Sequence, residues 1–213
     1  MVGDFVDKHQ EAVKKISEAG HEIGNHSNTH PHVNNLSLEE NIEEIKRCSE
    51  KIEKITGKKT TLYRGPYGEY NNTVIKAAKS QSHEAIQWNL DTLDYSGITG
   101  EEMWKRLENK LSSGSIILSH NGTKHTADSL DMLLTNIEQK GYQIVTVSDL
   151  IYKNDYYIDT NGTQTVNKNW ISNKIIGNNI ARKVGKYYNL ATNWNKKIRK
   201  FNFLCRQTKK KVV

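Results

Sequence analysis

The sequence predicts an α/β fold in which helices pack on the outside of a parallel sheet. Short apolar segments typical of strands alternate about five times with segments of helical periodicity along residues 1–152. Two helices begin with a Ser or Thr that is followed three residues later by Glu, which is the pattern of a capping box. This alternation is typical of an open α/β sheet or of a barrel, and both possibilities remain open at this point.

The first half of the chain contains three expected helices and two expected strands. Ser37 and Glu40 form one capping box, and Gly57 ends the helix that it opens. Cys48 falls on the apolar face of this helix, so we expect it to be a small core residue. The expected elements are a helix over 5–19, a strand over 21–25, a helix over 38–56, a strand over 61–63 and a helix over 72–79.

The second half continues the same alternation. Thr99 and Glu102 form the other capping box, for a helix that ends before Gly114. We expect Trp88 to be a core residue of its strand. The expected elements are a strand over 85–90, a helix over 100–113, a strand over 115–120, a helix over 126–139, a strand over 142–147 and a short helix over 148–151.

Charge divides the chain near residue 153. Residues 153–213 carry 14 Lys and Arg against 2 Asp and Glu, whereas residues 1–152 carry 17 against 22. The high isoelectric point therefore belongs to the C-terminal part. We expect a domain over 1–152 and a basic, helical extension over 153–213.

Polar side chains suited to chemistry follow four successive expected strands. They are His26 with His30, the run from Arg64 to Gly68, Asp91 with Asp94, and His120. In parallel α/β folds, catalytic groups gather where strands end. Each group alone also has a structural interpretation: a chance histidine pair, a turn, helix caps and a satisfied histidine.

The four groups together resemble the motifs of the NodB-homology polysaccharide deacetylases (carbohydrate esterase family 4). The similar segments, in order, are His26-Ser-Asn-Thr-His30, Arg64-Gly-Pro-Tyr-Gly68, Asp91-Thr-Leu-Asp-Tyr95 and Leu118-Ser-His120. The resemblance covers residues 1–151 and is nearest to the cell-wall type of spore formers. It implies a deformed (β/α) barrel and hydrolytic, metal-dependent N-deacetylation of acetylated amino-sugar glycans such as peptidoglycan or chitin-like polysaccharide.

The resemblance also implies roles for individual residues. His26 and His30 match two ligands of a divalent metal, commonly zinc. Arg64 matches the arginine that orients the catalytic aspartate, and the backbone N–H of Tyr67 would hold the oxyanion. His120 matches the general acid, with Asp94 fixing its tautomer. The substrate-binding positions would be Pro66, Gly68, Tyr95 and Leu118, with Tyr95 standing where the family often has Trp.

One family motif has no counterpart in the sequence. The family carries a Thr-Phe-Asp-Asp run on its first strand, which supplies the general base and a third metal ligand. Only 25 residues precede His26, and Asp4 and Asp7 lie outside such a context. We therefore expect an incomplete barrel lacking its first strands, and a rate lowered by roughly 10²–10⁴ through loss of the base. The alternative is a non-catalytic glycan-binding remnant.

The basic extension has three alternative interpretations. Apolar or small residues recur with heptad spacing over 180–206, while Lys and Arg occupy the other face of the expected helix. The helix would pack on the domain or lie in solvent, lie on an anionic membrane, or bind an anionic wall polymer or nucleic acid. The resemblance favours an envelope partner over any specific nucleic acid. It implies an envelope or extracellular location, whereas no signal peptide is visible, which predicts a cytoplasmic chain if Met1 is the true start.

Overall fold

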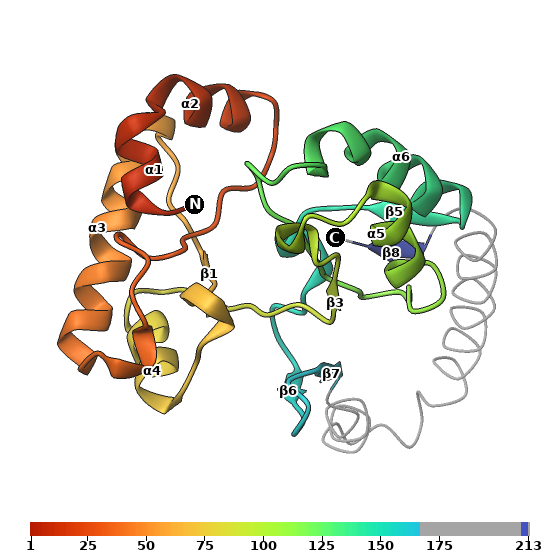
Figure 1. The fold of residues 1–213 in the computed structure, drawn as a ribbon. Helices are drawn as coiled ribbons and strands as arrows, with labels where there is room; N and C mark the ends of the chain where they lie inside the picture. Colours follow the sequence, from red (N-terminus) through yellow and green to blue (C-terminus); the bar gives the residue numbers. More distant parts are fainter. Residues whose placement is uncertain (167–209, 213) are drawn as a thin grey trace, which may run out of the picture. The chain divides into compact units, whose positions relative to one another are not determined.

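The computed structural model describes residues 1–166 and 210–212 of the chain. These residues form two compact units, Met1–Trp88 and Asn89–Val213, and each unit is described by itself (Figure 1). Both units combine helices with short strands, so the predicted α/β class is confirmed. The boundary expected at residue 153 stays a prediction.

The first unit consists of helices around one short parallel strand pair. Strand β1 pairs with β2 in parallel, with Leu62 opposite Glu84 and Tyr63 opposite Ala85. Asn25 forms an isolated parallel bridge with Tyr63. This bridge is the only part of the strand expected over 21–25 that forms. The elements are α1 (Gly3–Lys8), α2 (Gln10–Glu18), η1 (Val33–Asn35), α3 (Leu38–Thr56), β1 (Leu62–Tyr63), η2 (Pro66–Gly68), α4 (Asn72–Ser80) and β2 (Glu84–Ala85).

Helix α3 is the scaffold of this unit and lies against α1, α2 and α4 (Figure 1). It begins with the predicted capping box, because the side chain of Ser37 accepts from the N–H of Glu40 and the Glu40 carboxylate accepts from the N–H of Ser37. It ends at Gly57, whose φ of 68° is the left-handed conformation that glycine adopts without steric cost. Both helix boundaries were therefore predictable from local sequence.

Two apolar clusters hold the helices of the first unit together. One is centred on Val33, Ile45, Tyr63 and Val74 with the alanines of α4, and the other on Val6, Val13, Cys48 and Ile52. Cys48 is fully buried, as predicted, and its thiol forms no disulfide. The helix expected over 5–19 is in fact two helices, because His9 leaves the helical conformation with φ −132° and ψ 43°.

The second unit begins with a parallel strand pair and two helices. Strand β3 pairs with β4, with Leu90 opposite Ile117 and Asp91 opposite Leu118. Helix α5 starts with the predicted Thr99–Glu102 capping box and ends at Leu107, earlier than expected. The elements are β3 (Leu90–Asp91), η3 (Asp94–Ser96), α5 (Gly100–Leu107), β4 (Ile117–Leu118), α6 (Thr126–Gln139), β5 (Tyr142–Ile144), α7 (Val147–Leu150), β6 (Tyr156–Ile158), β7 (Gln164–Val166) and β8 (Lys210–Val212).

The core of the second unit lies between α5, α6 and the strands. Leu90, Met103, Leu107 and Leu133 form its centre, and Ile137 with Tyr142 extends it towards β5. The hydroxyl of Tyr142 donates to the carbonyl of Leu111 at 2.7 Å, which satisfies the polar end of this buried ring. β5 pairs in parallel with β8.

The strand expected over 85–90 is split between the two units. Its first residue, Ala85, ends β2 and its last residue, Leu90, begins β3, and the two strands belong to different pairs. Between them, the Gln87 side chain donates to the carbonyl of Gly68 at 2.6 Å instead of extending a strand. The apolar pattern therefore located the segment but did not show where its pairing changes.

The extension expected to be helical begins with a β-hairpin. β6 and β7 pair antiparallel, with Tyr156 opposite Val166. The heptad stripe over 180–206 lies outside the described residues and stays a prediction. Across the described part of the chain, none of the helices combines the length and the apolar character that a bilayer span requires.

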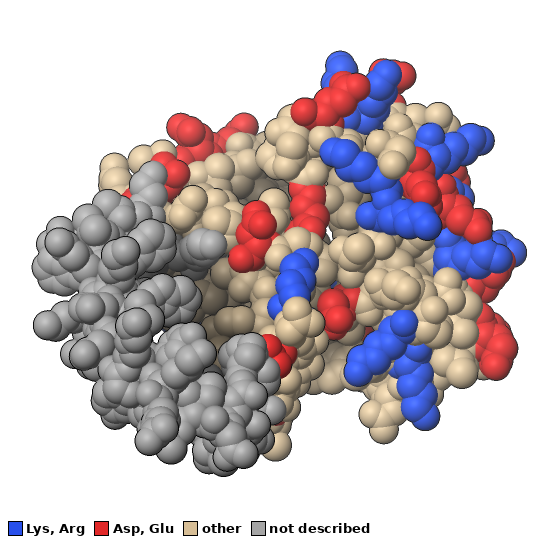
Figure 2. Space-filling view, turned by 180° about the vertical axis from the view of Figure 1, so that it is seen from behind, with Lys and Arg blue, Asp and Glu red and all other residues tan. Residues whose placement is uncertain are grey.

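Charged side chains of both signs cover the helical surface of the first unit. Lys and Arg are interspersed with Asp and Glu on the face seen in Figure 2. On α3, Arg47 pairs with Glu43 and Lys46 faces Glu50, both one helical turn apart. Exposed pairs of this kind each contribute only about 0.3–0.5 kcal/mol to stability.

Candidate functional site

The segment from Asn25 to His30 carries the first candidate residues. Asn25 is buried, and its side-chain amide donates to the carbonyl of Ile45 at 2.7 Å and to the hydroxyl of Ser49 at 2.8 Å. Its amide oxygen accepts from the N–H of Ser27 at 2.9 Å. Asn25 thus fixes the start of the loop to α3.

Two residues of this loop adopt a backbone conformation that is unfavourable for them. Ser27 has φ 66° and His30 has φ 61°, in the left-handed region. This conformation costs roughly 1–2 kcal/mol for each non-glycine residue. Strain of this kind persists only where surrounding contacts determine the loop, and it is typical of functional sites.

The two histidines lie next to each other, as the predicted pair requires. Their ring centroids are 5.0 Å apart in an edge-to-face arrangement. Nδ1 of His26 lies 2.6 Å from the carbonyl oxygen of Arg64, so it donates a proton there and leaves Nε2 with its lone pair. Burial lowers the pKa of His26 to about 4, so the ring is neutral at pH 7.

This donor set fits a divalent metal in part. A neutral imidazole whose second nitrogen donates to a backbone carbonyl is the usual form of a histidine ligand. However, catalytic zinc sites use three protein ligands. Within residues 1–166, no group of three or more His, Cys, Asp or Glu side chains is arranged to hold a metal ion. The two histidines therefore fit as half of a site.

The turn from Arg64 to Gly68 places a tyrosine beside His30. Tyr67 has φ 59° inside the 3-10 turn η2, and its side chain is 60% exposed. Its ring lies edge-on to His30, with centroids 4.7 Å apart. Pro66 is buried, and Gly68 has φ 70° with the Trp88 ring so close that a Cβ would lie 2.5 Å from it. The turn therefore requires glycine at position 68, and it holds Tyr67 in a conformation that is strained for a residue with a Cβ.

Arg64 is partly buried without a carboxylate partner among the described residues. Its guanidinium lies 5.4 Å from the centroid of Trp88 and donates weakly to the carbonyl of Gln87. Its Nε is buried with no hydrogen-bond partner. Burial lowers the pKa of Arg64. Trp88, expected in the core, is instead half-buried against Arg64 and Gly68.

Two residues that the sequence did not single out complete this cluster. His32 stacks on the Tyr67 ring with centroids 4.2 Å apart and an interplanar angle of 14°. Its Nδ1 lies 2.7 Å from Oε1 of Glu69. The third histidine of the run from His26 to His32 was the only signal available. Nothing in the spacing of Glu69, 37 residues later, predicts the contact.

Asp94 is the centre of the candidate site in the second unit. It is fully buried, and four groups donate to its carboxylate: the side chain and N–H of His120, and the hydroxyls of Ser119 and Thr126. Burial alone would raise the pKa of Asp94, but these hydrogen bonds outweigh it and lower the pKa to about 2. Asp94 is therefore an anion at neutral pH.

His120 is oriented by this carboxylate. Nδ1 of His120 lies 2.8 Å from Oδ1 of Asp94, so it donates and Nε2 is left to exchange protons. The ring of Tyr95 stands edge-on to His120 with centroids 5.3 Å apart, and its hydroxyl donates to Asp91 at 3.2 Å. Leu118 ends the paired part of β4, two residues before His120.

The structure thus brings the candidates together in two groups, one in each unit. The first unit joins His26, His30, Arg64, Pro66, Tyr67 and Gly68, and the second joins Asp94, Tyr95, Leu118 and His120. Asp94 and His120 are 26 residues apart in sequence, so their contact is a product of the β3–β4 pairing.

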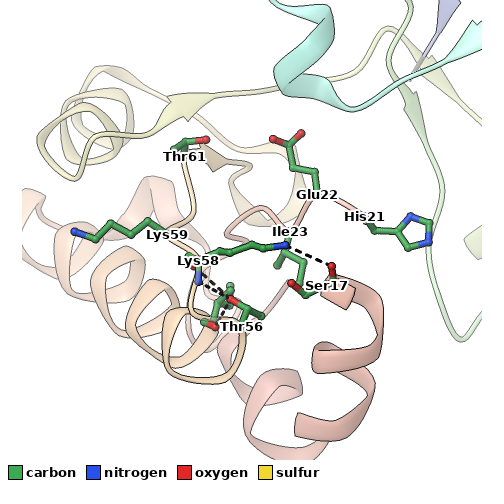
Figure 3. Close-up of a pocket in the computed structure, with 9 residues that line it drawn as sticks. Ser17, His21, Glu22, Ile23, Thr56, Lys58, Lys59 and Thr61 are labelled. Carbon is green, nitrogen blue, oxygen red and sulfur yellow. Dashed lines mark hydrogen bonds between the residues drawn. The ribbon is translucent and has the colours of Figure 1, made fainter. Parts of the chain in front are cut away.

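A pocket in the first unit does not belong to these groups. It has a volume of about 220 Å³ and lies where α2 and α3 end. The amine of Lys58 reaches the carbonyl of Ser17 at its wall (Figure 3). A cation beside the carbonyl end of a helix is stabilising, which explains the position of Lys58 without a ligand.

The chain is similar to bacterial deacetylases in sequence and structure. Residues 1–86 match the family model described as polysaccharide deacetylase. The uncharacterized protein YlxY of Bacillus subtilis is 34% identical over 149 residues, which are 70% of this chain and 46% of that protein. The peptidoglycan-N-acetylglucosamine deacetylase of Bacillus cereus is 28% identical over 70% of this chain and 56% of its own length. The chain thus spans about half the length of these relatives.

Solved structures give the same result. The peptidoglycan deacetylase PdaC of Bacillus subtilis is 32% identical, with a TM-score of 0.64 over 70% of this chain and 72% of that chain. BA3943 of Bacillus anthracis, described as a CE4 family pseudoenzyme, is 30% identical, with a TM-score of 0.67 over 70% of this chain and 53% of that chain. The protein belongs to the polysaccharide deacetylase family of hydrolases.

Proposed function

We propose that this chain takes part in hydrolytic N-deacetylation of acetylated amino-sugar glycan, with cell-wall peptidoglycan as the substrate class. The observation that carries the proposal is the buried, ionised Asp94 bonded to Nδ1 of His120. A carboxylate held in this way orients a histidine for proton transfer. The cell-wall deacetylases among the relatives support the substrate class.

In this reaction, His120 would be the general acid. Its Nε2–H would protonate the leaving amine nitrogen as the bond between carbon and nitrogen breaks. Asp94 would stabilise the doubly protonated ring that precedes this transfer, because its negative charge lies 2.8 Å from Nδ1. Proton transfer by a positioned side chain typically contributes roughly 10²–10⁴ in rate.

The first unit would handle the acetyl group. The N–H of Tyr67, which lies in a strained turn, would donate to the oxyanion that forms as water attacks the acetyl carbonyl. Pro66 and Gly68 would shape the backbone that approaches the substrate. In the second unit, Leu118 would be a substrate-binding residue, and Tyr95 would form an aromatic wall beside His120.

His26 and His30 would hold a divalent ion, with zinc the best match for two imidazoles. When bound, the ion would polarise the acetyl carbonyl and so favour attack on it. The carbonyl of Arg64 would keep His26 in the tautomer that ligation requires. The (β/α) barrel and the envelope or extracellular location rest on the likeness to the relatives and stay predictions.

A second candidate function is glycan binding without catalysis. The buried Nε of Arg64 has no partner, and the described residues supply two imidazoles but no third ligand. Both features favour a remnant that keeps the groove residues but not the full chemistry. Association of the segment 180–206 with an anionic membrane or wall polymer would fit either function.

Acetate release by the full chain distinguishes the two functions. The chain is incubated with Zn²⁺ or Co²⁺ and either N-acetylglucosamine oligomers or peptidoglycan, and both released acetate and bound glycan are measured. We expect release to fall at least about 100-fold in His120→Ala and to remain unchanged in the control His125→Ala. Glycan binding with no release of acetate would support the second function, and neither binding nor release would exclude both.

A further inference from the structure

Glu44 on α3 binds the loop that carries the two histidines. Its Oε2 accepts from the N–H of Asn28 at 2.9 Å and from the N–H of Thr29 at 2.8 Å. Its Oε1 accepts from the hydroxyl of Thr29 at 3.0 Å. One carboxylate thus holds three donors of the segment between His26 and His30.

The other backbone N–H groups of this loop are satisfied elsewhere. Those of Asn25 and His26 donate to the carbonyls of Leu62 and Met1. Ser27 donates to the side chain of Asn25, and His30 to the hydroxyl of Ser27. Only the amides of Asn28 and Thr29 depend on a side chain outside the loop. The bond from Asn28 is partly buried, whereas both bonds from Thr29 are exposed to solvent. The carboxylate therefore acts by fixing three neighbouring donors at one point of α3, and this determines the path between the histidines.

The opposite side of the loop is bound as well. The carbonyls of Ser27 and Asn28 accept from the amides of Gly3 and Asp4 at the start of α1. The loop therefore lies between α1 and α3, with its carbonyls facing one helix and its amides facing the other. This arrangement holds Ser27 and His30 in their left-handed conformations.

We propose that Glu44 is a positioning residue for metal binding by His26 and His30. The inference rests on the proposed metal pair and adds to it a residue that touches neither ring. Charge-assisted hydrogen bonds from a rigid helix hold the loop in one conformation before the ion arrives. Loss of such a supporting residue typically weakens metal affinity roughly 10- to 100-fold.

The test is metal affinity in the full chain, measured by calorimetry with Zn²⁺ and by the visible absorption of Co²⁺. Glu44→Ala removes all three acceptors. Glu44→Gln keeps most of them, because its amide oxygen can accept from both N–H groups while the Thr29 hydroxyl turns to accept from its amide. The matched control is Glu43→Ala, which removes the same charge from the preceding position of α3 and breaks only an exposed pair with Arg47.

We expect the affinity to fall roughly 10- to 100-fold in Glu44→Ala, to fall less in Glu44→Gln, and to stay unchanged in Glu43→Ala. Far-ultraviolet circular dichroism and urea unfolding of each variant establish that it is folded at the assay temperature. Equal affinities in Glu44→Ala and Glu43→Ala, with tight binding by the wild type, would overturn the role of Glu44 alone. No binding by the wild type, or equal binding by His26→Ala, would overturn the metal pair and the role of Glu44 with it.

Discussion

Nδ1 of His120 lies 2.8 Å from Oδ1 of Asp94, and the two side chains differ sharply in exposure: 42% for the histidine and 0% for the aspartate. One end of the imidazole is therefore held by a buried anion while the other end is open to solvent. This geometry joins a structural role of Asp94 to a chemical role of His120, and the two roles can be measured separately.

Asp94→Asn should destabilise the protein by about 3 kcal/mol at pH 7, because the buried site loses its charge and one acceptor. The pKa of Asp94 is lowered from its ordinary value of 3.8 to about 2. Its ionisation therefore contributes about 2 kcal/mol above pH 4. That contribution disappears as the pH falls through 2. Urea unfolding from pH 7 to pH 2 should show the gap between wild type and variant narrowing. Asp128→Asn, at an exposed position in the first turn of α6, should show a gap of less than about 1 kcal/mol at pH 7.

Gly68→Ala should cost more than the same change at another left-handed glycine. At Gly57 no atom lies within 4 Å of the place that a Cβ would occupy, so the cost there is the backbone term of about 1 kcal/mol. At Gly68 the Cβ would also meet the Trp88 ring at 2.5 Å, which adds about 1–3 kcal/mol. Thermal unfolding of both variants measures the difference. Equal costs would mean that Trp88 moves freely away from the turn.

His83 should make the first unit sensitive to mild acid. Its Nδ1 donates to the carbonyl of Gln81 at 2.7 Å, so its Nε2 accepts from the hydroxyl of Thr60 at 2.8 Å and the ring is neutral. Burial lowers the pKa of His83 below 6.5. The stability that this neutral ring contributes is complete above pH 6.5 and is lost as the pH falls further.

The comparison is urea unfolding of the wild type and of His83→Gln at pH 7 and pH 5. Both proteins retain His26, whose own buried ring contributes equally to each. The wild type should lose more unfolding free energy over this interval than the variant. Parallel losses would show that folding does not lower the pKa of His83.

Asn25→Asp should destabilise the protein, although aspartate has nearly the same shape as asparagine. The Asn25 amide donates to the carbonyl of Ile45, and a carboxylate there would face that carbonyl without a proton to share. We expect a loss of about 3 kcal/mol, and a smaller loss at pH 4 than at pH 7 because protonation restores a donor. Denaturant unfolding at both pH values measures this. Asn72→Asp in the exposed first turn of α4 is the control and should change stability by less than about 1 kcal/mol.

Local sequence predicted those features that depend on neighbours along the chain. The capping boxes at Ser37 and Thr99 and the end of α3 at Gly57 each involve residues within one helical turn, so the pattern contains the whole interaction. The strands were predicted less well. The segment 85–90 reads as one apolar strand, but its two ends pair with different partners, and pairing is decided by distant residues.

The candidate site divides in the same way. Its motifs were recognisable because members of a family share residue types in the same order along the chain. The contacts of His26 with His30 and of Asp94 with His120 are those that the predicted roles require. The stack of His32 on Tyr67 and the hydrogen bonds of Glu44 were not predictable. Each joins segments whose spacing carries no periodic signal.

The sequence by itself therefore determined the α/β class, both ends of α3, the start of α5 and the family, because these features depend on short-range patterns and on the order of motifs. Only the tertiary structure decided which groups touch: that Glu44 holds the histidine loop, that Arg64 keeps an unpaired Nε, and that four donors surround Asp94. The physical reason is that hydrogen bonds and burial act over a few ångströms in space, whatever the distance along the chain.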